Sequence, residues 1–222
     1  MFLYLKEFIK DLVPPLIWRF FSNIRKYKIA ESFVESDIIF EGNMELFLEL
    51  IKNCNVYGEY GCGQSTVWMA RNTKCKILAV DSSDIWVNRV QKRIDKLKDP
   101  ERIKLIYANC GTISHFGYPK DYSARFSYKN YLNSIWDYEI KPDLVLIDGR
   151  FRVASFLTSL LRSIPGTKIL FDDYTKRTQY HLVEEFLTPK IKTSRQALFI
   201  RPDKLNEEKI ISEINNFTFV KE

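Results

Sequence analysis

The sequence has few of the residues that build metal-binding or disulfide-rich modules. Its 222 residues include four cysteines and two histidines, and no cysteine forms a Cys-x-x-Cys pair or neighbours a histidine. This spacing excludes the usual zinc motifs. With 45% apolar residues over 222 positions, the chain is also unlike a small disulfide scaffold. We therefore expect buried thiols in a reducing compartment and a cytoplasmic protein.

Long uncharged runs are also missing near the start of the chain. The first 28 residues are apolar, but their longest uncharged stretch runs only from Leu12 to Trp18. A membrane-spanning helix needs ~20 such residues, and no small-residue cleavage site follows, so we expect neither a span nor a signal peptide. Internal repeats and low-complexity tracts are absent as well. The length fits one α/β domain.

Residues 1–36 are predicted to form an amphipathic helical arm in front of a domain over 37–222. Apolar residues at 2, 5, 8, 9 and 12 share one helical face, and Pro14-Pro15 ends that helix. The segment from Leu16 to Tyr27 mixes aromatic and basic residues, which suits a bilayer surface. Two interpretations stay open. Either the arm packs on its own domain or on a second subunit of a homo-oligomer, or residues 1–28 contact the inner face of the membrane.

The charge balance permits anionic partners but identifies none. The chain has 34 Lys+Arg against 28 Asp+Glu, a net charge of +6. Such a balance is compatible with phosphates or membrane headgroups. Because the sequence contains no separate basic recognition module, we expect no nucleic-acid partner.

From about residue 55, strand and helix patterns alternate. The predicted strands are Asn55–Glu59, Lys76–Asp81, Ile103–Ala108, Asp143–Asp148, Lys168–Phe171 and Ala197–Ile200. The predicted helices are Gln64–Arg71, Asp84–Leu97, Val153–Ser163, Lys176–Leu187 and Lys204–Asn215. This alternation predicts a parallel sheet with helices on both faces, whose ligands bind at the carboxyl ends of the strands.

Acidic residues end four of the first five predicted strands, at the edge where a ligand would bind. They are Glu59, Asp81, Asp148 and the pair Asp172-Asp173. A further segment, Gly111 to Tyr138, is rich in aromatic residues and carries His115. It lies between the third and fourth strands. It either forms a wall of the substrate site or packs on its own aromatic rings.

A glycine-rich turn joins the first strand to the first helix of the sheet. Gly61 and Gly63 allow the backbone to approach a ligand closely, but Thr66 stands at the third glycine of a dinucleotide fingerprint. Glu59, two residues before Gly61, would repel a pyrophosphate and suits a ligand that carries an ammonium group. These features favour S-adenosylmethionine, which has no phosphate.

The following strand ends support a nucleoside ligand. Asp81 stands 20 residues after Gly61, where a carboxylate can accept bonds from both hydroxyls of a ribose. Asn109 or Cys110, after the third strand, can contact the adenine.

With Glu59-x-Gly61-x-Gly63 and Asp81, the sequence resembles the class I methyltransferases that use S-adenosylmethionine, over about residues 40–202. The resemblance implies a Rossmann-like, doubly wound, seven-stranded sheet with a reversed last strand. Residues 190–193 and 196–201 would form the final hairpin. It also implies cofactor contacts, at Glu59, Gly61, Gly63, Ser65, Asp81, Asn109 and Cys110.

A narrower likeness comes from Asp148 with Asp172-Asp173. Magnesium-dependent O-methyltransferases of the macrocin and catechol type carry acidic metal ligands at these places. The resemblance therefore implies a Mg²⁺ site that would hold substrate oxygens and promote deprotonation of the acceptor hydroxyl. The alternative is that the aspartates cap the following helices.

The sequence departs from both types of enzyme at the position of the base. Arg150 stands where the sugar enzymes have an acid, and Phe151 stands where the catechol type has a lysine. No base is therefore assigned. His115, Asp173 and Tyr174 are candidates beside Asp148, which is also taken as catalytic.

The run Asp148 to Ala154 resembles a branch of these methyltransferases that accompanies glycan genes, and the leader at 10–15 resembles the openings of enzymes of surface-polysaccharide assembly. This likeness implies a sugar hydroxyl of a surface glycan as the methyl acceptor, with Arg150, Tyr174 and Arg177 in contact with it. For the arginines the alternative is neutralisation of nearby acids. Two other functions stay open: a nicotinamide-dependent sugar-modifying enzyme, and a non-catalytic scaffold in glycan assembly.

Overall fold

The computed structural model describes residues 39–40, 44–114 and 117–221. All of them belong to one compact unit, Ile38–Glu222. The arm predicted over 1–36 and the candidate base His115 lie outside the described residues. Within the described part of the chain, no helix has the length and apolar character needed to cross a membrane.

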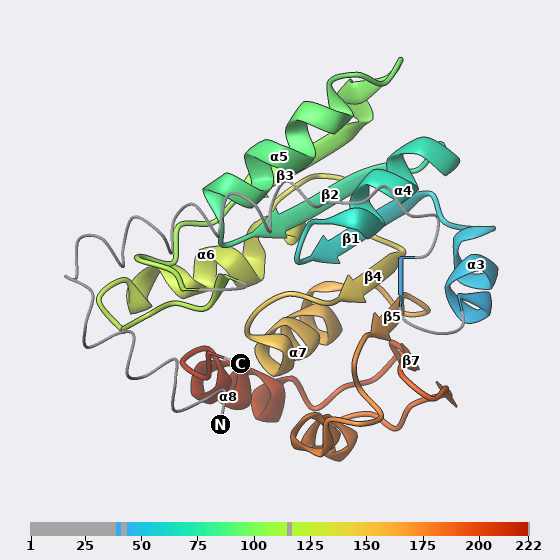
Figure 1. Ribbon diagram of the computed structural model, residues 1–222. Helices are drawn as coiled ribbons and strands as arrows, with labels where there is room; N and C mark the ends of the chain where they lie inside the picture. The colour runs from blue at the N-terminus through green and yellow to red at the C-terminus, as the bar shows by residue number, and fades with distance from the viewer. Residues whose placement is uncertain (1–38, 41–43, 115–116, 222) are drawn as a thin grey trace, which may run out of the picture. The chain divides into compact units, whose positions relative to one another are not determined.

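A seven-stranded sheet forms the centre of this unit (Figure 1), in the order β3-β2-β1-β4-β5-β7-β6. The strands are β1 (Val56–Tyr60), β2 (Lys76–Asp81), β3 (Ile103–Tyr107), β4 (Leu144–Ile147), β5 (Lys168–Phe171), β6 (Ile191–Lys192) and β7 (Ala197–Ile200). The first five pair in parallel, and β7 runs antiparallel to β5 and β6. The predicted reversed last strand and final hairpin are confirmed.

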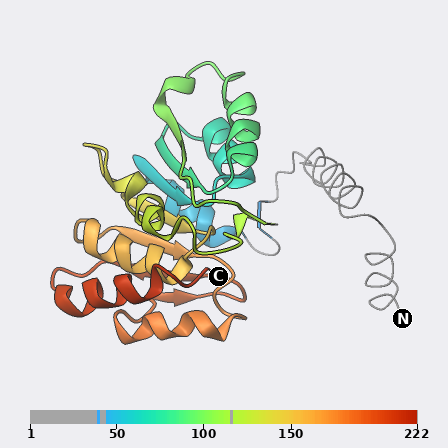
Figure 2. The same ribbon diagram turned by 90° about the vertical axis from the view of Figure 1, so that its left-hand side faces the viewer.

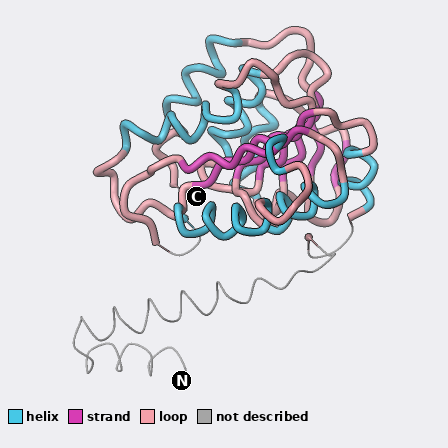
Figure 3. The backbone as a smooth tube through the Cα atoms, turned by 90° about the horizontal axis from the view of Figure 1, so that it is seen from above, coloured by secondary structure: helices cyan, strands magenta, loops and turns pink. Residues whose placement is uncertain are grey.

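Helices cover both faces of the sheet, as Figure 3 shows from above. They are α3 (Glu45–Ile51), α4 (Gln64–Asn72), α5 (Asp84–Ile94), α6 (Tyr128–Asn133), α7 (Arg152–Arg162) and α8 (Glu207–Phe217). Helix α4 contacts α5, while α7 contacts α6 and runs beside α8 (Figure 2). The doubly wound arrangement predicted from the alternation is therefore confirmed.

One predicted helix has a different form. The segment expected as a helix over Lys176–Leu187 is a 3₁₀ helix, Thr178–Glu185. A 3₁₀ helix turns once every three residues, so Tyr180 and Val183 share one face, and both are buried. Helix α5 also ends three residues earlier than predicted, at Ile94.

The later part of the aromatic segment between β3 and β4 enters the core, whereas Tyr122 and Phe126 are exposed. Tyr128, Tyr131 and Trp136 are fully buried, and the Trp136 indole donates to the Tyr60 hydroxyl at 2.9 Å. Residues 128 and 131 lie three apart on α6, so they point to the same side of the helix. These rings therefore pack inside the domain and do not line a cleft, which decides between the two interpretations for this part of the segment.

The cysteines are free thiols. Cys62, Cys75 and Cys110 are buried, as predicted, whereas Cys54 is only half-buried.

Candidate functional site

The glycine-rich turn brings the ends of β1 and β4 into contact. Gly61 has φ +93°, and a Cβ there would lie 2.6 Å from the Cα of Gly149, just after β4. Only glycine fits this close approach and this left-handed backbone. The turn then passes directly into α4 at Gln64. The sequence therefore places an open backbone loop at the carboxyl edge of the sheet, as predicted.

Glu59 lies buried under this turn and holds its shape. Its carboxylate accepts hydrogen bonds from the hydroxyls of Ser65 and Thr66, the latter at 2.5 Å. The Thr66 hydroxyl also accepts from the backbone N–H of Gly63 at 2.8 Å. Burial raises the pKa of Glu59 to about 8, although the two hydroxyls favour its charged form. Within the described residues no lysine or arginine forms an ion pair with it. A cationic ligand group would supply the missing charge.

Asp81 ends β2 in a similar environment. Its Oδ1 accepts a hydrogen bond from the backbone N–H of Ser83 at 2.8 Å. Burial raises the pKa of Asp81 to about 7. A Cβ on Gly117 would lie 3.8 Å from Oδ1, so the loop at 117 approaches this carboxylate closely.

Asn109 and Cys110 follow β3, the strand next to β2. The backbone N–H of Ala108 donates to the carbonyl of Asp81 at 2.9 Å, which brings the two strand ends together. Asn109 is exposed, and its Oδ1 accepts from the N–H of Gly111 at 2.9 Å. Cys110 is buried. The structure thus places both residues near Asp81, where the sequence predicts adenine contacts.

Arg150 lies on this side of the site. It is buried, its guanidinium stands over the Tyr118 ring at 4.0 Å, and its charge lowers the pKa of Asp81. Its backbone N–H donates to the Tyr131 hydroxyl at 3.0 Å. The Nη1 atom is buried and has no hydrogen-bond partner within the described residues. A buried donor without an acceptor is costly, so this atom indicates a place for a ligand. Sequence reasoning assigned Arg150 to the acceptor. Its position three residues after the end of β4 was the available signal for this location.

The three aspartates at the ends of β4 and β5 converge, as predicted. Ile147 and Phe171 are paired in register, so the residues that follow them leave the sheet side by side. One carboxylate oxygen from each of Asp148, Asp172 and Asp173 lies within 4.8 Å of the others. The capping interpretation does not apply to Asp148, because α7 begins after Phe151 and its first turn has no side-chain cap.

Three arginines neutralise these carboxylates. The pairs are Asp148 with Arg152 at 2.9 Å, Asp172 with Arg195 at 2.6 Å, and Asp173 with Arg177 at 2.5 Å and with Arg195 at 2.8 Å. Arg152 is buried and also donates to the backbone carbonyls of Gly149 and Asp172. The interpretation that arginines here neutralise the acids is therefore the one that the contacts support.

This arrangement does not fit a magnesium ion. Mg²⁺ requires free oxygen ligands in octahedral geometry. Both oxygens of Asp172 already accept hydrogen bonds from Arg195, and Gln196 donates to Oδ1 at 2.8 Å. An ion could bind only by displacing the Arg195 guanidinium. The resemblance to the magnesium-dependent enzymes therefore holds for the positions of the acids but not for their environment.

Two other predicted contacts are changed by packing. Tyr174 is fully buried between Phe171 and Phe199, and its hydroxyl donates to Glu184 at 2.7 Å. Burial and this carboxylate raise its pKa, so Tyr174 is neither a base nor an accessible contact for the acceptor. Asp173 keeps its place at the site, but its two oxygens are paired with arginines.

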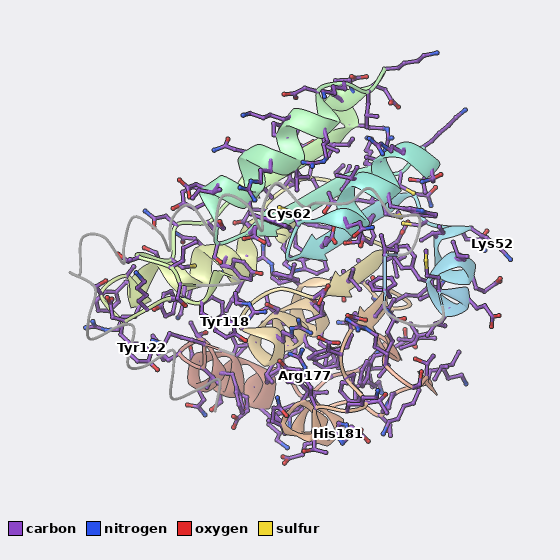
Figure 4. All side chains as sticks on the ribbon, in the orientation of Figure 1. Lys52, Cys62, Tyr118, Tyr122, Arg177 and His181 are labelled. Carbon is purple, nitrogen blue, oxygen red and sulfur yellow. The ribbon has the colours of Figure 1, made fainter. Side chains whose placement is uncertain are left out.

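Backbone strain marks the same part of the site. Among the described residues only Phe151 (φ +53°) and Asp173 (φ +56°) are non-glycine residues with positive φ. Phe151 stands three residues after Asp148, and Asp173 is itself one of the three aspartates. Such strain is concentrated at functional sites. Figure 4 shows Cys62 of the glycine-rich turn and Arg177 of the arginine group on different parts of this edge.

Solved structures with a similar fold are methyltransferases. A methyltransferase-like protein from Silicibacter pomeroyi is 26% identical, with a TM-score of 0.73 over 82% of this chain and 96% of that one. An O-methyltransferase from Bacillus cereus in complex with SAH is 16% identical, with a TM-score of 0.50 over 89% and 95%. A methyltransferase from Geobacter sulfurreducens is 13% identical, with a TM-score of 0.51 over 89% and 97%. The last two likenesses concern the fold.

No protein-family model and no curated protein sequence matches the chain. The strand order and these structures confirm the predicted resemblance. The chain has the class I methyltransferase fold, and it is similar to these methyltransferases.

Proposed function

We propose that the chain is an O-methyltransferase whose acceptor is a sugar hydroxyl in the synthesis of a surface glycan or polysaccharide. The observation that carries the cofactor assignment is that two strand-end carboxylates, the buried Glu59 and the half-buried Asp81, form no ion pair within the described residues. A ligand with an ammonium, a sulfonium and a ribose matches this charge and chemistry.

The residues around the turn would hold this cofactor. The backbone of the turn at Gly61 and Gly63 would lie against its amino-acid end, and the buried Glu59 would supply negative charge beneath it. Asp81 would accept bonds from the ribose hydroxyls, and Asn109 or Cys110 would contact the adenine. We add Arg150 to this group, because its unpartnered Nη1 lies on the Asp81 side and suits a carboxylate or hydroxyl oxygen.

Asp148 is the best placed residue to accept the proton of the acceptor hydroxyl. Its side chain is 31% exposed and its ion pair with Arg152 uses Oδ1, so Oδ2 forms no ion pair within the described residues. When bound, S-adenosylmethionine supplies a methyl group on a sulfonium. The methyl carbon would bond to the acceptor oxygen as the carbon–sulfur bond breaks, and the electrons of that bond would stay with sulfur in the leaving S-adenosylhomocysteine. Asp148 would take the hydroxyl proton, and the surrounding residues would orient the acceptor. His115 stays a prediction, because it lies outside the described residues.

A sugar acceptor rests on the resemblance of residues 148–154 to enzymes of polysaccharide gene clusters. Magnesium is not part of the proposal, because arginines already surround the three aspartates. Membrane contact through residues 1–28 and a homo-oligomer stay predictions.

The test has two stages on the full chain. First, calorimetric titration with S-adenosylhomocysteine should show one site with micromolar affinity, whereas NADH should show no fluorescence enhancement. Second, labelled methyl groups should pass to nucleotide-linked or lipid-linked glycans of the producing cell. The label should be stable to base, because a methyl ether is not hydrolysed by base, whereas a methyl ester is. Absence of cofactor binding, or NADH binding instead, would overturn the enzyme proposal. Cofactor binding with transfer only to nucleic acid or protein would overturn the sugar acceptor.

A further inference from the structure

A pocket opens beside the aspartates, away from the glycine-rich turn. It has a volume of about 330 Å³ and is lined by Asp173, Lys176, Arg177, Ser194 and Arg195. Two segments build it: the loop that follows β5, and the turn that joins β6 to β7. Asp173 belongs both to the pocket and to the group of three aspartates. A molecule in this pocket would therefore lie next to the end of β4, where Asp148 stands.

The two segments of the pocket are tied together by hydrogen bonds. The N–H of Thr175 donates to the carbonyl of Arg195 at 3.2 Å, and its hydroxyl donates to the carbonyl of Thr193 at 2.8 Å. The turn itself is closed by the N–H of Thr193, which donates to the carbonyl of Gln196 at 2.8 Å. The basic side chains thus project from a backbone that is held before any ligand binds, which lowers the entropic cost of binding.

Arg195 is oriented by buried partners. Asp172, which is fully buried, accepts from Nε and Nη2 of Arg195, and the two oxygens of Asp173 pair with Arg195 and Arg177. These carboxylates raise the pKa of Arg195, so its charge is permanent. The guanidinium is therefore a fixed positive charge at the wall of the pocket.

The charge of the lining is unbalanced. Lys176, Arg177 and Arg195 bring three positive charges against one from Asp173, a net +2, and +1 if the buried Asp172 behind Arg195 is included. Lys176 is exposed and has no carboxylate partner within the described part of the chain. Arg177 pairs with Asp173 through Nη2, while its Nε and Nη1 form no hydrogen bond within the described residues. The lining therefore favours an anion and disfavours a metal cation.

We propose that this pocket binds an anionic group of the methyl acceptor, a phosphate or a carboxylate, and so positions the acceptor hydroxyl at Asp148. Guanidinium groups bind such oxyanions through paired hydrogen bonds, and the Ser194 hydroxyl adds a donor. The identification of the anion as part of the methyl acceptor rests on the proposed function. The anion site itself rests on the pocket alone.

The experiment measures anion binding directly. The full chain is titrated at constant ionic strength with inorganic phosphate, a sugar phosphate, glucuronate and neutral glucose, with and without S-adenosylhomocysteine. Heteronuclear NMR shifts report the site. We expect saturable shifts of Lys176, Arg177, Ser194 and Arg195 with phosphate-type or carboxylate-type anions and none with glucose. The two anion arms distinguish a phosphorylated acceptor from a uronic acid.

Three variants separate a site from general attraction. Arg177→Ala should weaken anion binding about tenfold through loss of a charged hydrogen bond. Lys176→Ala should weaken it severalfold, and this exposed position keeps the test valid if Arg177→Ala destabilises the fold. Lys190→Ala removes an exposed lysine from the same hairpin outside the pocket and should leave binding unchanged.

The outcomes distinguish this inference from the proposed function. All three variants should keep the affinity for S-adenosylhomocysteine. Cofactor binding without any anion binding would overturn the pocket, as would equal weakening by Lys190→Ala and Lys176→Ala. Anion binding without cofactor binding would overturn the proposed function and leave the anion site in place.

Discussion

Acidic residues follow the strands in both halves of the sheet's carboxyl edge, but the two halves give them opposite electrostatic settings. At the ends of β1 and β2, Glu59 and Asp81 form no ion pair within the described residues, and burial raises their pKa values to about 8 and about 7. At the ends of β4 and β5, each of three aspartates is paired with an arginine. The first half has carboxyl groups that form no ion pair within the described residues. The second half has its negative charge neutralised and presents basic side chains to the pocket.

This difference teaches how a strand-end acid should be interpreted. A buried carboxylate without a cation is costly, so its persistence indicates a ligand that supplies positive charge. Asp172 and Asp173 have both oxygens held by guanidinium groups, so they are already satisfied, and their main role is to position those groups. The β1–β2 half therefore fits the cationic cofactor, and the β4–β5 half fits an anionic acceptor.

The largest expected effect concerns the buried pair on the β4–β5 half. Asp172→Ala should lower the free energy of unfolding by about 3–5 kcal/mol, because it leaves the charge of Arg195 and the amide of Gln196 without their partner. Urea denaturation measures this. The control is Glu49→Ala, which breaks an exposed pair with Lys52 and should cost less than about 1 kcal/mol. If the two variants were equally stable, the Asp172–Arg195 pair would not organise this half of the edge.

The next effect concerns cofactor binding on the β1–β2 half. Asp81→Asn should weaken the affinity for S-adenosylhomocysteine about 10- to 100-fold, because the amide cannot accept two ribose hydroxyls as a carboxylate does. Calorimetry measures the affinity. Asp84→Asn, an exposed acid three residues further on, serves as the matched control and should bind normally. Unchanged binding by the Asp81 variant would contradict the assignment of this half to the cofactor.

The third effect is a dependence of stability on pH. The pKa of Glu59 is about 8 in the folded chain against an ordinary 4.5, so the folded state holds this proton more tightly than the unfolded state. The resulting stabilisation is complete below pH 4.5 and is lost as the pH rises toward 8. The slope for one such group is at most about 1.4 kcal/mol per pH unit.

Urea denaturation of the cofactor-free chain between pH 5 and 8 should show this loss, and Glu59→Gln should make the curve flatter. Asp81 acts in the same direction, so a smaller slope should persist in the variant. A wild-type stability that rises with pH over this interval would show that Glu59 is ionised in the folded chain.

The smallest expected effect is that of metal removal. EDTA or added Mg²⁺ should change cofactor affinity and methyl transfer by less than about twofold, because arginines occupy the space that an ion would need. Transfer rates in metal-depleted buffer, with Mn²⁺ binding followed by electron paramagnetic resonance, measure this. Strong dependence on Mg²⁺ would show that Arg195 leaves Asp172 in the working enzyme and would remove the contrast between the two halves.

Local patterns in the sequence were enough to predict the cofactor half. The turn from Glu59 to Gly63 and the acid at Asp81 lie within one strand-helix-strand unit. Contacts between residues that are near one another in the sequence therefore set their positions. The same holds for the convergence of Asp148 with Asp172 and Asp173, because parallel neighbours in a sheet bring their carboxyl ends together. The reversed final hairpin was predicted through the resemblance to class I methyltransferases.

The aromatic segment shows a limit of local sequence patterns, which do not predict which of its rings are buried. Eight aromatic residues and one histidine in a predicted loop do not show which rings face a cleft. Only the short helix α6, packed against the core, decides that Tyr128 and Tyr131 are buried. Burial likewise moves Tyr174 from the predicted acceptor site to the interior, since its ring fills space between Phe171 and Phe199.

The sequence by itself therefore determined the order of strands and helices, the open glycine-rich turn and the line of acids at one edge, because these follow from residue periodicity and backbone geometry. Only the tertiary structure decided which of these acids receive a counter-charge. Arg195 reaches Asp172 because β7 runs back along β5 and brings its turn to the same edge. Arg195 and Asp172 are 23 residues apart in the sequence, so only the strand arrangement brings them into contact. The free energy of a buried charge depends on whether the fold places a counter-charge beside it.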